Sequence, residues 1–455
     1  MNHTNENIGA YVDMLAGKRR SNIISSASDY DHFDTPSYFV SPNGNDANDG
    51  TSPAAAWKTL EKANALVSDK ECNLLFERGG IWRGSITVHG NVTVSAYGSG
   101  AKPLFLGSPE NGAGAEKWTK VGGTESVWQF YRELPDCGNI VFDDRAFAVR
   151  VMPELADGKF VFDPVADLGS DMTFASLAAD GKDGALYLRC DAGNPGALYG
   201  DIEFAVKGDG LTSLGDNVTV NNLAFRYYGG NGAVCADGVK GFILYFNEYK
   251  WIGGSVVEYV GGKAMRGGCG VTVRGSVERH FVDTCVFDQI YDSALSLWLE
   301  KPAYAKKVIY SNNLIENCPF SIGYVCRDKD EGSKIDDFQL LSNICRNAGS
   351  GFGMSGRCGH CVPSHVNTCG RADNAASALV FKNNIFDGSD GQLVFISAAD
   401  ASSLPRMLKN IYIGKDGSKF GGYGVKPVQV TDYHDIGQQA LAALTKEYGA
   451  EFYFV

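Results

Sequence analysis

The feature that most constrains the fold of this chain is a unit that recurs from about residue 216 onward. Each unit has a short apolar run, one polar residue, a second apolar run and a corner of Gly, Asp or Ser, as in "KVIYSNNLIENCPFSIGYV" (residues 307–325). Units that repeat every roughly 25 to 40 residues with loops of unequal length are typical of a solenoid. The recurring polar positions are Asn222, Asn247, Cys285, Asn313, Asn343 and Asn384.

The repeat predicts an all-β fold, a parallel β-helix. Its strands are short and no helix-length periodic segment separates them, which excludes a doubly wound sheet. Stacking coil on coil buries the apolar runs and brings the recurrent asparagines together as an internal turn ladder. A β-propeller would need four strands per blade joined by tight hairpins, and "NG" or "DG" hairpin signals are too few for that.

The rest of the chain fits around this solenoid. We expect residues 1–35 to form a cap and linker. Within them, "NIGAYVDMLAG" is expected to form a short amphipathic helix that ends at Gly17 and covers the open end of the solenoid. Residues 36–105 predict the first coils. Residues 106–205 break the rhythm with antiparallel-looking strands and predict an inserted β-sandwich-like domain. Residues 206–455 then form the main β-helix and a C-terminal cap.

Composition narrows the functional classes. The chain has 53 acidic and 41 basic residues, a net charge of −12, and shows no basic stripe for nucleic acid. No apolar window approaches the roughly 20 residues that span a bilayer, and no secretory signal is present, so we expect a cytoplasmic protein that does not bind membranes. Its 12 cysteines are then expected to be reduced thiols. The sequence leaves the oligomeric state open, a homo-oligomer included.

One segment has the donors of a metal site. "CGHCVPSHVNTC" supplies Cys358, Cys361, His365 and Cys369, a set that tetrahedral zinc accepts. The spacing matches no standard zinc finger, and buried thiols are common in solenoid loops. We therefore predict no metal and no other cofactor.

Several segments resemble a known group of proteins. "YFVSPNGNDANDGTSPAAAWKTLEKA" (residues 38–63) with "LLFERGGIWRG" (residues 74–84) resembles the opening of right-handed parallel β-helix proteins of the pectate-lyase-like superfamily. "GNIVFDD", "WIGGS" and "IYDSALS" are similar to segments of bacterial β-helix glycosidases, the group of β-xylosidases and lacto-N-biosidases. The likeness runs from residue 38 to about 395. It implies a right-handed β-helix, an oligosaccharide substrate and a site role for the aspartate of "IYDSALS", Asp292.

The chain departs from this group in one place. In the resembling glycosidases a carboxylate often follows in the next coil, where this chain has "FSIGYV" (residues 320–325) with Gly323 at the corresponding position. The resemblance therefore does not supply the second acid.

Long insertions after the second strand of successive units, such as residues 261–270, 300–306, 327–337 and 356–377, predict a loop wall at one corner of the solenoid. Alternation along the strand that follows Asp292 directs Asp292 and Trp298 outward, toward that wall. Asp283 and Asp288 are predicted to cap turns. The candidate catalytic residues are Asp292, Glu258 and Glu316, and the candidate substrate-binding residues are Tyr291, Trp298, Glu300, Arg266, Arg274, Arg327, His365 and Trp251.

These residues favour a glycoside hydrolase that works with two carboxylates. Two alternatives stay open. One is a polysaccharide lyase or epimerase, in which a Lys or Arg base acts beside a uronate and calcium. The other is a non-catalytic glycan-binding β-helix.

Overall fold

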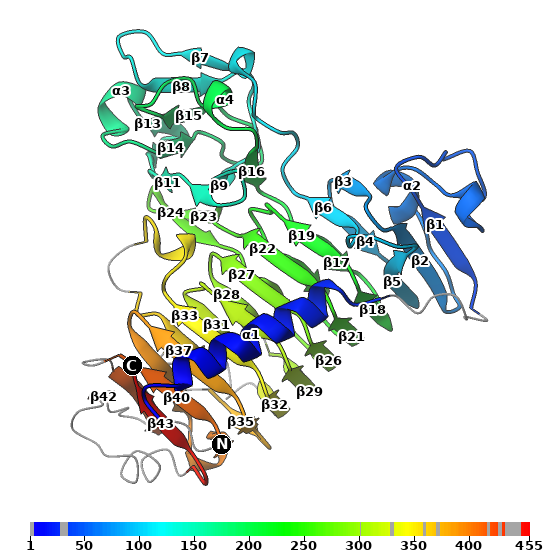
Figure 1. Ribbon diagram of the computed structural model, residues 1–455, viewed down its shortest axis with the longest axis vertical. Helices are drawn as coiled ribbons and strands as arrows, with labels where there is room; N and C mark the ends of the chain where they lie inside the picture. Colours follow the sequence, from blue (N-terminus) through cyan, green and yellow to red (C-terminus); the bar gives the residue numbers. More distant parts are fainter. Residues whose placement is uncertain are drawn as a thin grey trace.

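The computed structural model describes residues 4–27, 35–300, 302–327, 332–357, 361–369, 374–415, 419–425, 430–432 and 447–455. The chain folds as a right-handed parallel β-helix with an inserted β-domain, as predicted (Figure 1). Each full coil contributes one strand to each of three long sheets, here named A, B and C in the order in which the chain visits them. The repeat unit of the sequence, with its two apolar runs, predicted only two strands per coil.

The three sheets have 11, 10 and 10 strands. Sheet A contains β1 (Ser37–Val40), β2 (Cys72–Glu77), β5 (Val92–Tyr97), β18 (Val218–Asn221), β21 (Val239–Tyr245), β26 (Val277–Asp283), β29 (Tyr304–Ser311), β32 (Lys334–Leu341), β36 (Val380–Lys382), β39 (Arg406–Leu408) and the short β35 (Ala376–Ser377). Sheet B contains β3 (Ile81–Arg83), β6 (Leu104–Leu106), β19 (Ala224–Arg226), β22 (Glu248–Ile252), β27 (Val286–Ile290), β30 (Leu314–Glu316), β33 (Ile344–Ala348), β37 (Ile385–Ser389), β40 (Ile411–Gly414) and β43 (Glu451–Phe454). Sheet C contains β4 (Ile86–Val88), β17 (Leu211–Ser213), β20 (Ala233–Cys235), β25 (Val271–Arg274), β28 (Ser293–Leu299), β31 (Phe320–Cys326), β34 (Ser364–Asn367), β38 (Gln392–Ala398), β41 (Lys419–Val425) and the antiparallel β42 (Val430–Asp432).

The predicted asparagine ladder lies at the corner between sheets A and B. The backbone N–H of Asn313 donates to Asn343 Oδ1 at 3.1 Å, and that of Asn343 donates to Asn384 Oδ1 at 3.0 Å. Cys285 occupies a rung of this ladder, and its Sγ accepts from the Asn247 N–H at 3.4 Å. Each rung thus satisfies a buried backbone donor of the neighbouring coil.

The ends of the ladder differ from the prediction. Asn222 is not a rung: it has a φ of 58° and forms the left-handed turn residue one position before the ladder, where Leu223 takes the rung. Asn tolerates the left-handed conformation better than most residues. An asparagine in the sequence can therefore be either a left-handed turn residue or a rung of the ladder, and the sequence does not distinguish the two. The ladder also continues to Asn410, and Glu447 accepts from the Asn410 N–H at 2.5 Å.

The solenoid interior is filled by apolar side chains that stack along its axis. Phe105, Phe225, Tyr249 and Phe287 come from successive strands of sheet B, and their ring centroids are 5.4, 5.4 and 4.9 Å apart. Side chains at equivalent positions of successive coils stack on one another, because the parallel strands pair in the same register from coil to coil.

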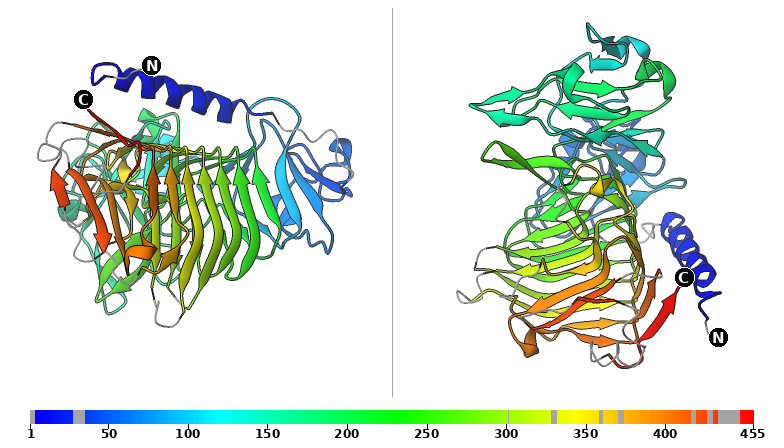
Figure 2. Two further views of the ribbon diagram at one scale, coloured as in Figure 1. Left: turned by 90° about the horizontal axis from the view of Figure 1, so that it is seen from below. Right: turned by 90° about the vertical axis from the view of Figure 1, so that its left-hand side faces the viewer.

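The N-terminal helix is longer than predicted and lies elsewhere. Helix α1 (Ile8–Ile24) continues through Gly17 and runs along the outer surface of sheet B, across several coils, instead of covering the open end (Figure 2). Its buried side chains, which include Ile8 and Val12, pack on outward apolar residues of sheet B such as Leu314 and Ile344. Hydrophobic contact with these strands, more than the sequence of the helix itself, determines its position. A second short helix, α2 (Leu60–Asn64), follows β1.

The strands between β6 and β17 form the inserted domain, which projects from the side of the solenoid (Figure 1). Its sheets have the orders β10-β9-β16 and β11-β14-β15-β8-β7 and share one apolar core that includes Trp118, Phe130 and Phe204. Its elements are β7 (Trp118–Lys120), β8 (Val127–Phe130), β9 (Cys137–Phe142), β10 (Ala146–Phe147), β11 (Val149–Arg150), β12 (Glu154–Ala156), β13 (Lys159–Val161), α3 (Pro164–Asp167), β14 (Thr173–Ser176), β15 (Leu186–Arg189), α4 (Pro195–Leu198) and β16 (Ile202–Val206).

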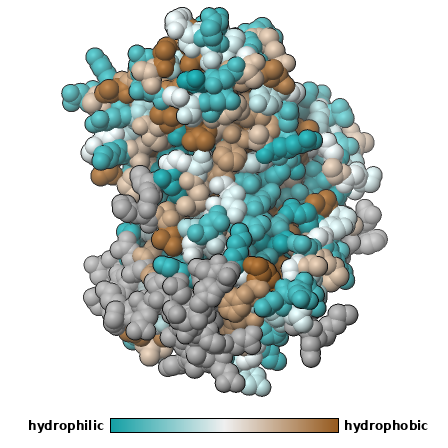
Figure 3. Space-filling model, turned by 60° about the vertical axis from the view of Figure 1, so that its left-hand side comes forward, coloured by the Kyte–Doolittle hydropathy of each residue, from teal (hydrophilic) through white to brown (hydrophobic). Residues whose placement is uncertain are grey.

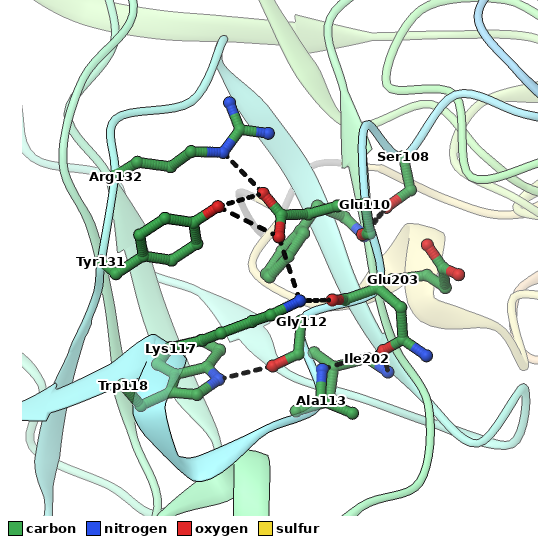
Figure 4. Close-up of polar contacts among 12 residues, drawn as sticks. Ser108, Glu110, Gly112, Ala113, Lys117, Trp118, Tyr131, Arg132, Ile202 and Glu203 are labelled. Atoms are coloured by element: carbon green, nitrogen blue, oxygen red, sulfur yellow. Dashed lines mark hydrogen bonds and ion pairs between the residues drawn. The ribbon is translucent and has the colours of Figure 1, made fainter.

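Ion pairs tie the inserted domain to its own entry strand and to the solenoid. Glu110, in the entering segment, accepts hydrogen bonds from Lys117, Tyr131 and Arg132 (Figure 4). At the solenoid, Asp144 pairs with Lys250 at 2.8 Å and with Arg226 at 3.2 Å. These contacts hold the domain against the edge where sheets B and C meet.

Candidate active site

The insertions that surround the candidate site all lie at the corner between sheets B and C. They are the inserted domain, the antiparallel hairpin of β23 (Ser255–Val260) and β24 (Lys263–Gly267), and residues 349–357 with 361–363. The segments after β28, β31 and β34 lead instead from sheet C to sheet A. The single loop wall predicted from the sequence is therefore wrong: its members divide between two corners, because each coil has three strands and not two.

Asp292 lies at the B–C corner, between β27 and β28. Its backbone N–H donates to Gly268 O at 3.0 Å, which fixes the residue against the preceding coil. Its side chain is 32% exposed, and Oδ1 accepts from Arg357 Nη2 at 3.1 Å. A Cβ added to Gly267 would lie 4.0 Å from Oδ2, so the absence of a side chain there leaves this oxygen open.

Arg357 is the functional candidate that sequence analysis missed. It belongs to the segment after η4 (Phe352–Met354) and also donates to the backbone carbonyls of Gly353 and Tyr291. These bonds hold its guanidinium beside Asp292, which in turn raises the pKa of Arg357 in spite of burial. In the sequence, the one sign of a role for Arg357 is its position in the long insertion of residues 356–377. The cysteines of that insertion indicate a metal site more directly than the arginine indicates a partner for Asp292.

Tyr291 is buried between two arginines. Its ring centroid lies 4.3 Å from the guanidinium carbon of Arg357 and 4.5 Å from that of Arg266. Arg266 comes from β24 and donates to the carbonyls of Gly254 and Gly138, so it joins the hairpin to the inserted domain. Burial lowers the pKa of Arg266 to about 10. Tyr291 and Arg266 therefore support the corner under Asp292 and are not open substrate contacts.

Two adjoining cavities flank this corner. The one beside Gly267 and Gly268 has a volume of about 400 Å³, and Arg274 and Lys207 also line it. The other, of about 500 Å³, lies between the hairpin and the inserted domain and is lined by Glu258, among others. Hydrophobic colours gather beneath the inserted domain in Figure 3, where the domain meets the solenoid.

Glu258, a predicted catalytic residue, is exposed on β23, in the hairpin that lies between sheets B and C. Within the described residues its carboxylate has no ion-pair partner. Glu258 lines the cavity of about 500 Å³ between the hairpin and the inserted domain.

Trp298, Glu300 and Arg327 form a cluster at the end of sheet C. The Trp298 indole N–H donates to Glu300, and the Arg327 guanidinium carbon lies 5.2 Å from the centroid of the Trp298 ring. Arg327 Nη1 lies 3.7 Å from Glu300 Oε1, so the two side chains form an ion pair. Arg274 is the register neighbour of Trp298 in the preceding coil, so this cluster adjoins the Arg274 cavity along the outer face of sheet C.

Three predicted site residues have structural roles instead. Glu316 lies on the outer face of sheet B under α1, is paired with Arg20 and Arg346, and has its pKa raised by burial. Trp251 is buried where the inserted domain meets the solenoid, and its Nε1 donates to Asp144 Oδ1 at 2.8 Å.

His365 is fully buried, with Nδ1 3.0 Å from Ser321 Oγ, and burial lowers its pKa to about 3. It cannot meet a substrate or join the exposed Cys369 in a metal site. Cys358 lies outside the described residues, and the described part of the chain brings together no three His, Cys, Asp or Glu side chains that could hold a metal ion. None of the 11 described cysteines forms a disulfide.

Asp283 and Asp288, the two aspartates that precede Asp292, bind turn residues of the next coil, in keeping with the turn-capping role predicted for both. Asp283 Oδ1 accepts from Ser311 Oγ at 2.5 Å and from Asn312 Nδ2 at 2.9 Å. Asp288 accepts from Asn317 Nδ2 at 2.8 Å. Of the three aspartates, only Asp292 lies at the B–C corner.

Sheet C does not supply a second acid beside Asp292. Gly323 is in register with Ser296 of the preceding coil and Asn367 of the following one. This column of the outer face contains Thr272, Ser296, Gly323 and Asn367 and therefore no carboxylate. The hairpin and the end of the sheet offer Glu258 and Glu300 as partner acids, and Asp180 and Asp183 of the inserted domain line the same cavity as Glu258.

No protein-family model and no curated protein matches the sequence. Solved structures with a similar fold include a GH136 lacto-N-biosidase from Eubacterium ramulus, with a TM-score of 0.45 and 11% identity over 92% of this chain and 68% of that one. Another is XylC in complex with xylose, with a TM-score of 0.44 and 11% identity over 92% and 82%. A rhamnogalacturonan lyase has a TM-score of 0.43 and 8% identity over 87% and 79%. Within the described part of the chain, no helix combines the length and apolarity that crossing a membrane requires.

Proposed function

We propose that the chain is a carbohydrate-active enzyme, a glycoside hydrolase that cleaves oligosaccharides at the B–C corner. The observation that carries the proposal is the setting of Asp292. Its carboxylate is partly exposed and paired with Arg357, and its Oδ2 would lie 4.0 Å from a Cβ at Gly267, a residue that lines the cavity. A carboxylate that is held by an arginine and still reaches solvent suits a nucleophile or a general base, both of which act in the ionised form.

Hydrolysis of a glycosidic bond also requires an acid that protonates the leaving oxygen. We propose Glu258 for this role, because it lines the adjoining cavity and has no ion-pair partner among the described residues. Glu300 is the second candidate, although it is already bound to Trp298 and paired with Arg327. Glu258 lies on a hairpin, so its distance from Asp292 is set by the hairpin and not by the coil spacing.

The experiment is a screen of aryl glycosides and short oligosaccharides with wild-type protein and Asp292→Asn, each with and without chelator. Asn keeps the size and most hydrogen bonds of Asp, so the variant is expected to fold normally and to lose roughly 10³-fold or more in turnover. Asp283→Asn is the matched control, because the same change falls on a turn cap, and it is expected to keep most activity. Equal turnover by Asp292→Asn and wild type on a cleaved substrate would refute the proposal.

A second candidate function is non-catalytic glycan binding. It is favoured by the absence of any carboxylate from the column Thr272, Ser296, Gly323 and Asn367 of sheet C. In that case the screen gives binding without turnover, and Asp292→Asn alters affinity only. A lyase or epimerase would instead give calcium-dependent products, with an unsaturated ring in the case of the lyase.

A further inference from the structure

The cavity beside Asp292 has an unusual charge for this protein. Among its lining residues Lys207 and Arg274 are cationic and only Asp209 is anionic, which makes two positive charges against one negative, a net +1. The whole chain carries −12. Lys207 also lines the adjoining cavity, whose acids are Asp136, Asp180, Asp183 and Glu258, so the excess of positive charge belongs to this cavity and not to its neighbour. A local positive charge of this kind attracts anions that the rest of the surface repels.

Both cations are available to a ligand. Lys207 and Arg274 are exposed, and neither side chain has a hydrogen-bond or ion-pair partner within the described residues. Other arginines around the corner are committed: Arg357 to Asp292 and Arg150 to Asp136. Lys207 and Arg274 are therefore free to meet a ligand, whereas Arg357 and Arg150 are not.

The single acid of the cavity is committed within the protein. Asp209 Oδ1 accepts from the N–H of Asn231 at 2.6 Å and from Asn231 Nδ2 at 2.9 Å. Asn231 Oδ1 in turn accepts from the Cys269 N–H at 3.0 Å. Asp209 thus orders the loop between β19 and β20 and does not neutralise Lys207 or Arg274 by direct contact.

Part of the cavity wall is main chain. A Cβ at Gly230 would lie 2.6 Å from Asp209 Oδ1, and one at Gly268 would lie 2.3 Å from the Cα of Gly253, so neither position can carry a side chain without moving the backbone. Gly267 also lines the cavity, and a Cβ there would lie 3.0 Å from Val257 Cγ2 and 4.0 Å from Asp292 Oδ2, which places Asp292 next to this wall.

We infer that this cavity binds a carboxylate-bearing sugar, a uronic acid unit of the glycan that is cleaved at Asp292, through Arg274 and Lys207. The inference rests on the proposed function for the cleavage itself, and it adds the substrate class. A guanidinium can grip a carboxylate through two parallel N–H···O bonds, while an ammonium adds charge without fixed geometry. The acidic sugar then occupies the cavity directly beside the residue proposed to attack or to activate water.

The test measures binding and does not need turnover. Galacturonate and glucuronate trisaccharides and their neutral methyl esters are titrated by calorimetry into wild type, Asp292→Asn and Lys207→Ala/Arg274→Ala. At least one acidic trisaccharide is expected to bind wild type and Asp292→Asn about tenfold or more tightly than its ester at low salt. The preference is expected to shrink at high salt and to disappear in the double variant.

A charge-matched control is Lys240→Ala/Lys306→Ala, because both lysines are exposed on sheet A and away from the cavity. This variant is expected to keep the preference for the acid. Failure of every acidic trisaccharide to bind, equal binding of acid and ester, or a preference that survives in Lys207→Ala/Arg274→Ala would each overturn the inference.

The two proposals fail separately. If Asp292→Asn abolishes cleavage of neutral glycans and no acid preference exists, the uronate inference falls and the hydrolase proposal stands. If the acid preference is present and depends on Lys207 and Arg274 while Asp292→Asn cleaves normally, the hydrolase role of Asp292 falls and the binding site stands.

Discussion

The asparagine ladder offers the prediction whose magnitude follows most directly from the structure, and Asn343 is its central rung. The Asn343 side chain is fully buried and makes four hydrogen bonds. Its Oδ1 accepts from the N–H and Nδ2 of Asn313 at 3.1 and 3.0 Å, and its Nδ2 donates to Tyr310 O at 2.9 Å and to Asn384 Oδ1 at 3.0 Å.

Asn343→Ala removes all four bonds and leaves the backbone N–H of Asn313 without its acceptor. A buried donor left unsatisfied costs about 1 to 3 kcal/mol, and a typical hydrogen bond contributes about 1 kcal/mol. Some of the other groups keep a second partner: Asn313 Nδ2 still donates to Val282 O at 2.9 Å. We therefore expect the free energy of unfolding to fall by about 3 to 5 kcal/mol.

Urea denaturation followed by circular dichroism measures this change, with Asn22→Ala as the control. Asn22 is exposed on α1, so the same chemical change there is expected to be neutral or slightly stabilising. A loss below about 1 kcal/mol for Asn343→Ala would refute the idea that the ladder satisfies obligatory buried donors. Asn343→Asp is expected to be at least as damaging at neutral pH, because it places a charge in the solenoid interior.

Three further predictions concern other parts of the molecule. His280 is fully buried, and burial lowers its pKa to about 4, so the folded state stays neutral while the unfolded state takes up a proton below pH 6.5. As the pH falls from 6.5 to 4, protonation of His280 in the unfolded state should lower the free energy of unfolding by about 3 kcal/mol. In urea titrations across that pH range, His280→Phe should therefore lose less stability than the wild type. Arg357→Lys is expected to lower kcat on a cleaved glycoside with little change in unfolding midpoint, because an ammonium cannot hold Asp292 and the two carbonyls together; an unchanged kcat would remove Arg357 from the site. Val12→Asp places a carboxylate in the contact between α1 and sheet B and is expected to release the helix, seen as faster tryptic cleavage after Arg19 or Arg20, whereas equal cleavage rates would show that α1 is not held by its apolar face.

Several features of the site could be predicted from the sequence because they are local. Asp292 was distinguished from Asp283 by its place at a corner before an outward-facing strand, and in the structure Asp283 caps a turn whereas Asp292 is partly exposed at the B–C corner. Trp298 was expected to face outward, and its ring does lie beside the guanidinium of Arg327. Where a residue's role depends on a neighbour in another element, the expectation failed: the acid Glu316 is covered by α1.

The repeat alone determined the β-helix and its ladder, because the alternation of apolar residues and the recurrent asparagines record contacts between equivalent positions of adjacent coils. Only the tertiary structure decided which loops share a corner, since that depends on three strands per coil, a number that the spacing of one polar residue does not reveal. It also decided that Arg357 meets Asp292 across a sequence separation of 65 residues. The position of α1 along sheet B was also decided by the tertiary structure, because the spacing of Ile8 and Val12 indicates an apolar face but not which apolar surface that face covers.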